Sequence, residues 1–209
     1  MGAFLFSKYR YTGHMKPILF IDFDGTLCHD RFWSHLSLDK QELIQNYLFK
    51  ENSHIVIDWM KGKYNSEEIN QLISEKLNLN YQEIWNSFVL GCQKMYIHKT
   101  NLEIIRELRK KYCIVLITDN MDCFDRFTLP ALNLQDYFDL IINSYNEGIS
   151  KNEKDGALFI KVLSRLNTDI KNSTLLDNSQ NTCQIFDRLG GQSKLVTTEK
   201  DVGFWLKAF

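Results

Sequence analysis

Two carboxylates separated by one residue stand directly after an apolar run. Residues 18–21 have the composition of a β-strand that is covered on both faces, and Asp22 and Asp24 follow them. In open parallel sheets, ligands bind beyond the carboxyl ends of the strands. Close like charges raise each other's pKa unless a cation lies between them. The pattern therefore predicts an acidic site that requires a lysine or a hard cation such as Mg²⁺.

The same residues suit covalent chemistry. One aspartate is able to attack as a nucleophile, as in aspartyl-phosphate chemistry, while the other transfers a proton. Gly25 and Thr26 complete an Asp-x-Asp-Gly-Thr motif. The alternative is a plain turn, with Asp24 and Gly25 as turn residues and Asp22 as a cap. The apolar run before the motif favours the functional interpretation.

This segment resembles the first motif of the haloacid dehalogenase-like (HAD) superfamily, whose members are mostly phosphatases. The resemblance implies that Asp22 is the nucleophile and Asp24 the general acid and base. It also implies that Phe23 and Thr26 help to bind the substrate, in part through main-chain amides near the carboxylates. Three further motifs are then expected, each at the end of a later strand.

The second motif is expected after residues 113–117, another apolar run, which ends in Thr118. A hydroxyl donates to a phosphate oxygen without adding negative charge, and the resemblance assigns this role to Thr118 and a substrate-binding role to Asn120. In isolation Thr118 would be a helix N-cap. Asp119 departs from the commonest family pattern, and we expect it to turn away or to cap a helix starting near Met121.

The third motif follows residues 140–144, a strand-like run that ends in serine. Gly148 and Lys151 continue a spacing that resembles this motif, whose lysine neutralises the clustered carboxylates and the phosphate. Lys154 competes for the role. The family usually places an apolar residue and a phenylalanine soon after its lysine, and Leu158 and Phe159 lie farther from Lys151 than that pattern has them. A surface lysine is the alternative for either position. We favour Lys151.

The fourth motif resembles residues 173–177, a short strand that ends in Asp177. The family often places a second acid next, but Asn178 stands there, and an amide oxygen ligates a metal without adding charge. Helix capping is the alternative role for Asp177. The resemblance implies a Mg²⁺ ion held by the carboxylates of Asp22 and Asp177 and by the main-chain carbonyl of Asp24.

Strand-like runs alternate with amphipathic helices along most of the chain, which predicts a parallel, doubly wound sheet of the Rossmann-like α/β class. Apolar residues recur at helical spacing over residues 102–108, 158–166 and 185–189, and residues 194–197 have the pattern of a short final strand. We expect the catalytic core to comprise residues 1–27 and 100–209.

Residues 28–99 contain no long strand-like run. Helices are predicted there at residues 41–50, 54–60, 67–77 and 82–92, the third with a capped start at Asn65 and Ser66. The resemblance places an α-helical cap in this position, which would exclude water and bring selectivity. The polar and aromatic candidates to line it are Arg31, Phe32, Trp33, His35, Trp59, Lys61, Lys63, Trp85 and His98.

Composition narrows the class of protein. The chain has 209 residues, enough for one sizeable core and a small second domain, and its formal net charge of -1 does not favour nucleic acid or an anionic membrane. The 5 cysteines are odd in number and lack a Cys-x-x-Cys pair, which argues for reduced thiols in the cytoplasm and against zinc. Residues 1–10 lack the features of a signal peptide, and no run approaches the length of a membrane span.

The combined interpretation is a Mg²⁺-dependent phosphatase that acts on a small phosphorylated metabolite. A haloacid dehalogenase would use Asp22 but would not need Asp24. A sugar phosphomutase would share every motif and the cap. A non-catalytic binding module on the same scaffold would have no need for the complete set of motif residues.

Overall fold

A computed structural model describes residues 16–209 of the chain. Its centre is a five-stranded sheet with the order β3-β2-β1-β4-β5, and all neighbouring strands are parallel. The strands are β1 (Ile18–Ile21), β2 (Cys113–Thr118), β3 (Leu140–Asn143), β4 (Ser173–Asp177) and β5 (Gln192–Leu195). Because β1 lies between β2 and β4, the residues that follow these three strands meet at one edge.

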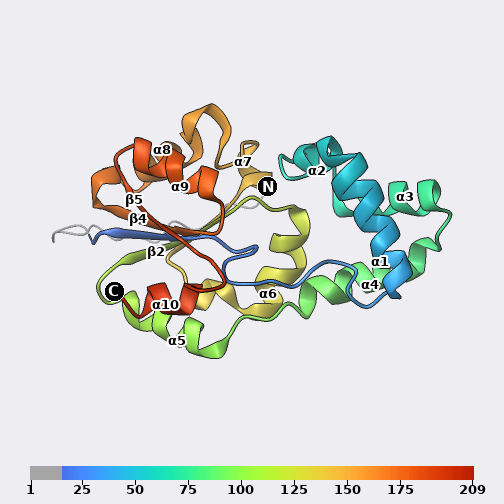
Figure 1. Cartoon of the computed structure of the whole chain (residues 1–209), viewed down its shortest axis with the longest axis horizontal. Helices are drawn as coiled ribbons and strands as arrows, with labels where there is room; N and C mark the ends of the chain where they lie inside the picture. Colours follow the sequence, from blue (N-terminus) through green and yellow to red (C-terminus); the bar gives the residue numbers. More distant parts are fainter. Residues whose placement is uncertain (1–15) are drawn as a thin grey trace.

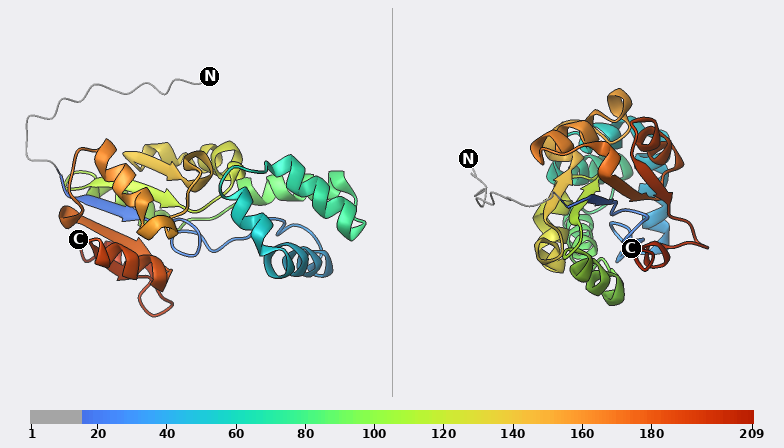
Figure 2. Two further views of the ribbon diagram at one scale, coloured as in Figure 1. Left: turned by 90° about the horizontal axis from the view of Figure 1, so that it is seen from above. Right: turned by 90° about the vertical axis from the view of Figure 1, so that its left-hand side faces the viewer.

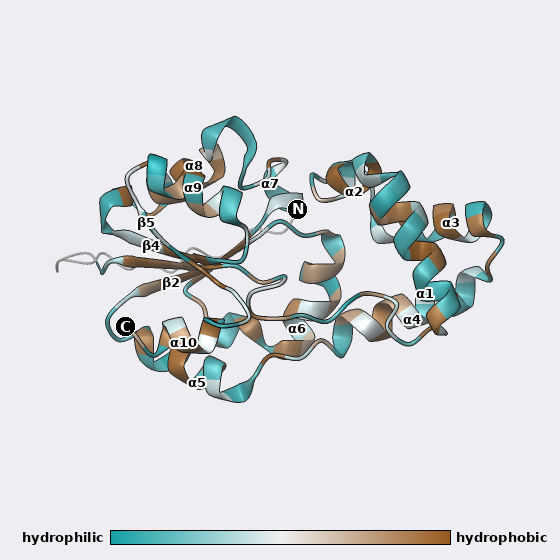
Figure 3. Ribbon diagram, viewed as in Figure 1, coloured by the Kyte–Doolittle hydropathy of each residue, from teal (hydrophilic) through white to brown (hydrophobic). Residues whose placement is uncertain are grey.

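Helices cover both faces of this sheet (Figure 1). One face carries α8 (Ala157–Arg165) and α9 (Gln180–Arg188), and the other carries α5 (Lys99–Leu108) and α10 (Val202–Leu206). Side chains alternate between the two layers, so that Phe20 belongs to the first and Leu19 to the second. The residues of β1 and most of those of β2 are apolar (Figure 3), as expected for strands buried on both faces. The predicted Rossmann-like, doubly wound α/β fold is confirmed.

Short elements complete this part of the chain. They are η2 (Phe124–Thr128), α6 (Leu129–Leu132), η3 (Leu134–Asp136), α7 (Ser144–Glu147), η4 (Glu153–Asp155) and η5 (Ile170–Asn172). Among the described residues, every helix is too short or too polar to cross a lipid bilayer. All five cysteines are free. Residues 1–10, which we predicted to lack the features of a signal peptide, lie outside the described residues.

A second group of helices lies beyond the carboxyl ends of the strands (Figure 2). It consists of α1 (Leu38–Ile44), which continues into the wider turns of η1 (Gln45–Glu51), and of α2 (Ser53–Trp59), α3 (Ser66–Leu77) and α4 (Tyr81–Gln93). We call residues 38–93 the helical unit. It has a core of its own, in which Trp59 and Phe88 are fully buried.

The predicted helices of this region are confirmed to within three residues at each end. Local capping explains the accuracy: the Asn65 side chain accepts from the Glu68 main-chain N–H, and the Glu68 carboxylate accepts from Asn65 N. The final strand was less predictable. It runs over Gln192–Leu195 instead of residues 194–197, because its register follows its pairing with β4 and not an apolar pattern. The helix α10 was not predicted.

Candidate active site

The first predicted carboxylate is buried at the end of the central strand. Asp22 is 3% exposed, and its Oδ1 accepts a hydrogen bond from Lys151 Nζ at 2.7 Å. The same ammonium donates to Asp177 Oδ2 at 2.6 Å. Lys151 is 4% exposed, whereas Lys154 lies on the surface. The geometry therefore brings Asp22, Lys151 and Asp177 together and leaves Lys154 outside.

Two carboxylates share one ammonium here, so the cluster has an excess of negative charge. Burial raises the pKa of Asp22 to about 7; Lys151 opposes this shift, and the Asp177 charge adds to it. Burial by itself would lower the pKa of Lys151, but the charges of Asp22, Asp177 and Asp119 outweigh it and hold that pKa above its ordinary range. The lysine therefore stays protonated, and the surplus negative charge attracts a further cation.

Thr26 links the carboxylate of Asp22 to the main chain of Asn178 by hydrogen bonds. Thr26 Oγ1 donates to Asp22 Oδ2 at 3.0 Å and accepts from the Asn178 main-chain N–H at 3.2 Å. Gly25 adopts φ +77°, and a Cβ there would lie 2.2 Å from the Asn178 side chain, so the turn requires glycine. Thr26 is buried and lines neither of the two cavities at the site. Its hydroxyl holds the Asp22 carboxylate in place, and a contact between Thr26 and the substrate stays a prediction.

Oxygen donors suited to Mg²⁺ meet beside the Asp22 carboxylate. When the Asn178 amide presents its nitrogen, that nitrogen donates to Asp22 Oδ2 at 3.2 Å and to the main-chain oxygen of Asp24 at 3.3 Å. The main-chain oxygen of Asp24 and the carboxylates of Asp22 and Asp177 are the kind of hard oxygen ligand that Mg²⁺ prefers. Among residues 16–209 no three His, Cys, Asp or Glu side chains form a metal cluster. The residues fit a hard cation held by few carboxylates and by neutral oxygens, with Asp177 adjacent.

Asp24 lies on the open side of the site. Its side chain is 58% exposed and forms an ion pair with Arg31 at 2.7 Å. Asp24 lines both cavities, the one that contains Asp22 and a larger one beneath the helical unit. Although one residue separates them, the Asp22 carboxylate is buried at the end of β1, whereas the Asp24 carboxylate lies where the two cavities meet.

Unpartnered hydrogen-bond donors lie at the carboxyl ends of β1 and β2. Thr118 Oγ1 is fully buried and has no hydrogen-bond partner among the described residues. Within residues 16–209, no hydrogen bond engages the main-chain N–H groups of Phe23 and Asp24. The Phe23 ring is buried against Phe124 and lies away from both cavities. Free donors beside a buried carboxylate form a cradle for a tetrahedral oxyanion.

Asn120 lies beside this cradle, but its main chain is already engaged. Its N–H donates to Ser144 Oγ at 3.1 Å, and its Oδ1 accepts from the Met121 N–H. The expected contribution of the Asn120 main-chain amide to phosphate binding therefore does not fit the geometry. Its side chain lines the larger cavity, where it remains available to a ligand.

The expectation for Asp119 was wrong. Its Oδ1 accepts from the main-chain N–H of Lys151 at 2.9 Å, so it neither turns away nor caps a helix near Met121. This bond fixes the segment that carries the lysine. Burial raises the pKa of Asp119, and the nearby Lys151 charge opposes the shift. Asp119 lines both cavities, as Asp24 does.

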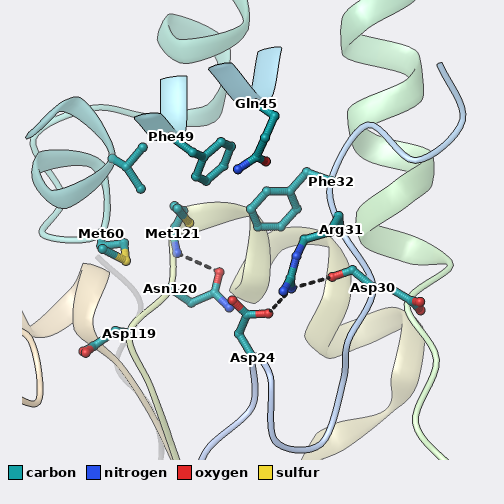
Figure 4. A pocket seen from close by; sticks show the side chains of 11 residues that line it. Asp24, Asp30, Arg31, Phe32, Gln45, Phe49, Met60, Asp119, Asn120 and Met121 are labelled. Carbon is teal, nitrogen blue, oxygen red and sulfur yellow. Dashed lines mark hydrogen bonds and ion pairs between the residues drawn. The ribbon is translucent and has the colours of Figure 1, made fainter. Parts of the chain in front are cut away.

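The larger cavity has a volume of about 350 Å³ and lies between the sheet edge and the helical unit (Figure 4). Of the nine side chains predicted to line this region, only Arg31 and Phe32 do so. Trp33 and Trp59 are buried in the core of the helical unit. The sequence did not reveal the other apolar lining residues, Phe49, Val56, Met60 and Met121, because they have the pattern of ordinary core positions.

Comparison with known proteins places this arrangement in a family. A family model described as haloacid dehalogenase-like hydrolase matches residues 17–184. A HAD family enzyme from Bacteroides thetaiotaomicron superposes with a TM-score of 0.70 at 21% identity, covering 88% of this chain and 94% of that chain. L-2-haloacid dehalogenase from Xanthobacter autotrophicus superposes with a TM-score of 0.63 at 12% identity, covering 88% and 80%. No curated protein matches the chain.

The two structural likenesses show a shared fold, and the family model extends over most of the chain. The matched region, residues 17–184, includes the strand ends that carry Asp22, Thr118 and Asp177. The chain belongs to the haloacid dehalogenase-like hydrolases.

Proposed function

We propose that this hydrolase is a Mg²⁺-dependent phosphatase that acts on a small phosphorylated metabolite through an aspartyl-phosphate intermediate. The observation that carries the proposal is the position of Asp24. Its carboxylate lies where the cavity that contains Asp22 meets the larger cavity. That junction is where the oxygen of a leaving group would emerge from a phosphate bound against Asp22.

An acid at this junction distinguishes the two main reaction classes. An alkoxide is a poor leaving group and requires a proton from a positioned acid. A halide leaves without one, so a dehalogenase has no use for Asp24. The Asp24–Arg31 pair is largely exposed, and exposed pairs are weak, so Asp24 is able to exchange Arg31 for a substrate oxygen.

The proposed reaction has two displacements at phosphorus. In the first, a carboxylate oxygen of Asp22 forms a bond to phosphorus while the ester P–O bond breaks, and Asp24 gives its proton to the departing oxygen. In the second, Asp24 removes a proton from water as the water oxygen attacks phosphorus. The Asp22–phosphorus bond then breaks, which releases inorganic phosphate and restores the free carboxylate.

Lys151 and Thr118 would stabilise the equatorial oxygens during both displacements. The ammonium supplies a fixed positive charge, and the unpartnered hydroxyl supplies a donor that needs no reorganisation. Bound Mg²⁺ would offset the repulsion between the anionic nucleophile and the phosphate; Asp22, Asp177 and the main-chain oxygen of Asp24 would hold it. The Bacteroides enzyme has also been crystallised as a complex with magnesium and inorganic phosphate, which supports this assignment.

We further propose that residues 28–99, which contain the helical unit, act as a cap over the core formed by residues 1–27 and 100–209. The cavity between the helical unit and the sheet edge supports this division. Such a cap would exclude water from the aspartyl phosphate until the leaving group has departed.

A screen for released phosphate and released halide tests the proposal. The purified protein is incubated with a panel of phosphorylated metabolites and with 2-haloacids, in Mg²⁺ or in EDTA. We expect Mg²⁺-dependent release of phosphate and no release of halide. Halide release without phosphate release would assign the chain to the dehalogenases.

The control variant is Asp22→Asn, which keeps the size of the nucleophile and removes its charge. We expect turnover to fall at least about 10⁴-fold, because the covalent step is lost, while circular dichroism and thermal unfolding still show a folded protein. Turnover near the wild-type rate in this variant would refute the assignment of the nucleophile.

A further inference from the structure

We propose that the leaving group of the substrate is a compact, uncharged alcohol with an apolar body. Neither a polyhydroxylated sugar nor an alcohol that bears a second anionic group fits the cavity. This inference rests on the proposed phosphatase function and adds the substrate class to it. It follows from the lining of the 350 Å³ cavity that Asp24 and Asp119 connect to the phosphate side of the site.

The helical unit lines the cavity with three apolar side chains, Phe49, Val56 and Met60, and with one amide, Gln45. Five apolar side chains line the cavity: Phe32, Phe49, Val56, Met60 and Met121. In Figure 4, Phe32 and Phe49 flank one side of the cavity, and Met60 lies across it. The volume is at the small end of the range for ligand sites, so the body that fits is compact.

Polar groups are too few to satisfy a sugar. On the apolar wall only the Gln45 amide offers hydrogen bonds, and no described residue hydrogen-bonds its side chain. A hexose has several hydroxyls, and each one buried against Phe or Met without a partner weakens binding by roughly five- to a hundredfold. One hydroxyl or carbonyl on the leaving group is able to reach Gln45 and another the Asn120 side chain, but the hydroxyls that face Phe49, Val56 and Met60 would remain unsatisfied.

The charges of the lining oppose a second anion. The carboxylates of Asp24 and Asp119 line the floor, and Arg31 is the one basic residue among the described lining residues. Its guanidinium is already paired with Asp24. The Asp30 carboxylate points away and accepts from the Tyr96 N–H at 2.6 Å. Even when Asp24 releases Arg31 to bind a substrate oxygen, that one guanidinium is outnumbered by the carboxylates of Asp24 and Asp119, so a carboxylate or phosphate on the leaving group would meet a lining of net negative charge.

Three primary alkyl phosphates separate these classes while keeping the reacting ester alike. They are 2-phenylethyl phosphate, which has an apolar body, glucose 6-phosphate, which is polyhydroxylated, and phosphoglycolate, which is anionic. We expect kcat/KM for 2-phenylethyl phosphate to exceed both others by at least about tenfold. An equal or higher value for glucose 6-phosphate or phosphoglycolate would overturn the inference.

A polar substitution in the apolar wall tests the cause of this preference. Met60→Gln keeps the side-chain length and adds an amide to the cavity, and we expect it to shift the kcat/KM ratio about tenfold toward glucose 6-phosphate. The matched control is Ile57→Gln on the same helix, whose side chain is 46% exposed and lies outside the cavity lining. It should leave the ratio unchanged. An equal ratio in both variants would refute the role of the wall.

Binding separates a failure of this inference from a failure of the phosphatase proposal. Calorimetry on Asp22→Asn with Mg²⁺ measures the affinity for each of the three esters without turnover. Suppose that the wild-type protein hydrolyses none of the three esters, but that the variant binds 2-phenylethyl phosphate most tightly. The cavity assignment then stands, and the phosphatase assignment falls. If the wild-type protein hydrolyses the esters but the variant binds glucose 6-phosphate or phosphoglycolate more tightly, only the cavity assignment is overturned. If the variant binds none of the three esters, the cavity assignment is also overturned.

Discussion

Two buried carboxylates of this protein, Asp122 and Asp22, differ in how many donors and cations the surrounding residues supply to them. Asp122, 5% exposed at the junction of the core and the helical unit, accepts from Trp59 Nε1 at 2.8 Å, Ser66 N at 3.1 Å, Ser66 Oγ at 2.8 Å and Arg126 Nη1 at 2.7 Å. Asp22 shares its one cation with a second carboxylate. The first carboxylate is fully satisfied by the protein, and the second is not.

The difference separates a structural role from a chemical one. Four donors stabilise the charge of Asp122 and attach the helical unit to the core, so nothing remains for a ligand to add. At the other site, Asp22 and Asp177 share one ammonium, and the buried hydroxyl of Thr118 has no partner among the described residues. Polar groups left unsatisfied in the protein are those that a bound phosphate and cation would complete.

After Asp22→Asn, the largest expected effect concerns the lysine between the carboxylates. Lys151→Ala removes the counter-charge of Asp22 and Asp177, and we expect kcat/KM for phosphate release to fall by about 10³-fold or more. Lys154→Ala, an exposed neighbour, should retain turnover within about twofold. Steady-state kinetics on both variants measures this. Loss of turnover in Lys154→Ala alone would show that the lysine of the third motif was misplaced.

The next effect should appear in stability. Asp122→Ala leaves the Trp59, Ser66 and Arg126 donors buried without their acceptor, and we expect the free energy of unfolding to fall by roughly 2–4 kcal/mol. Denaturant unfolding followed by tryptophan fluorescence measures the loss. Asp58→Ala, which removes the partner of the exposed Lys63, is the control and should cost less than about 1 kcal/mol. Equal losses in both variants would contradict the structural role of Asp122.

The comparison also shows what the sequence was able to predict. Asp22, Thr118 and Asp177 were predictable because each directly follows or ends an apolar run, and parallel strand ends meet at one edge. The Asp122 network was not, because its partners lie 56 and 63 residues earlier in the chain, on helices whose docking no local pattern specifies.

Similar limits apply within the site. The Asp119–Lys151 contact joins residues 32 positions apart through a main-chain N–H, a donor that every residue except proline carries and that leaves no signal in the sequence. The apolar cavity wall was missed because Phe49 and Met60 resemble core residues in their spacing. The sequence therefore predicted the groups of the proposed chemistry, and the structure was needed to find those that we propose select the substrate.

A smaller effect compares two buried hydroxyls. Thr118→Val removes a group that has no described partner, and we expect unchanged stability with a 10- to 100-fold lower kcat/KM, the range for one oxyanion donor or less. Thr128→Val removes a hydroxyl that donates to the Cys92 main-chain oxygen at 3.0 Å. That control should lose about 1 kcal/mol of stability and keep its turnover. The opposite pattern would reverse the roles assigned to the two threonines.

The smallest expected effect is a pH dependence at the junction beside Asp122. Glu67 on α3 accepts from Arg126 at 2.7 Å, and this bond holds the pKa of Glu67 below its ordinary value near 4.5. A lowered carboxylate pKa contributes stability above the ordinary value, and this contribution is lost as the pH falls through the lowered one. Because both side chains are partly exposed, it should not exceed about 1 kcal/mol.

Glu67→Gln should therefore be slightly less stable than the wild type at pH 6, and the difference should vanish in acid. Thermal unfolding of both proteins between pH 6 and pH 3 measures it, with Glu42→Gln, an exposed substitution on α1, as the control. A difference that stays constant with pH would mean that Glu67 stabilises the junction by packing alone. In that case the charge of Asp122, which accepts from Trp59 and Ser66, would attach the helical unit to the core without help from the charge of Glu67.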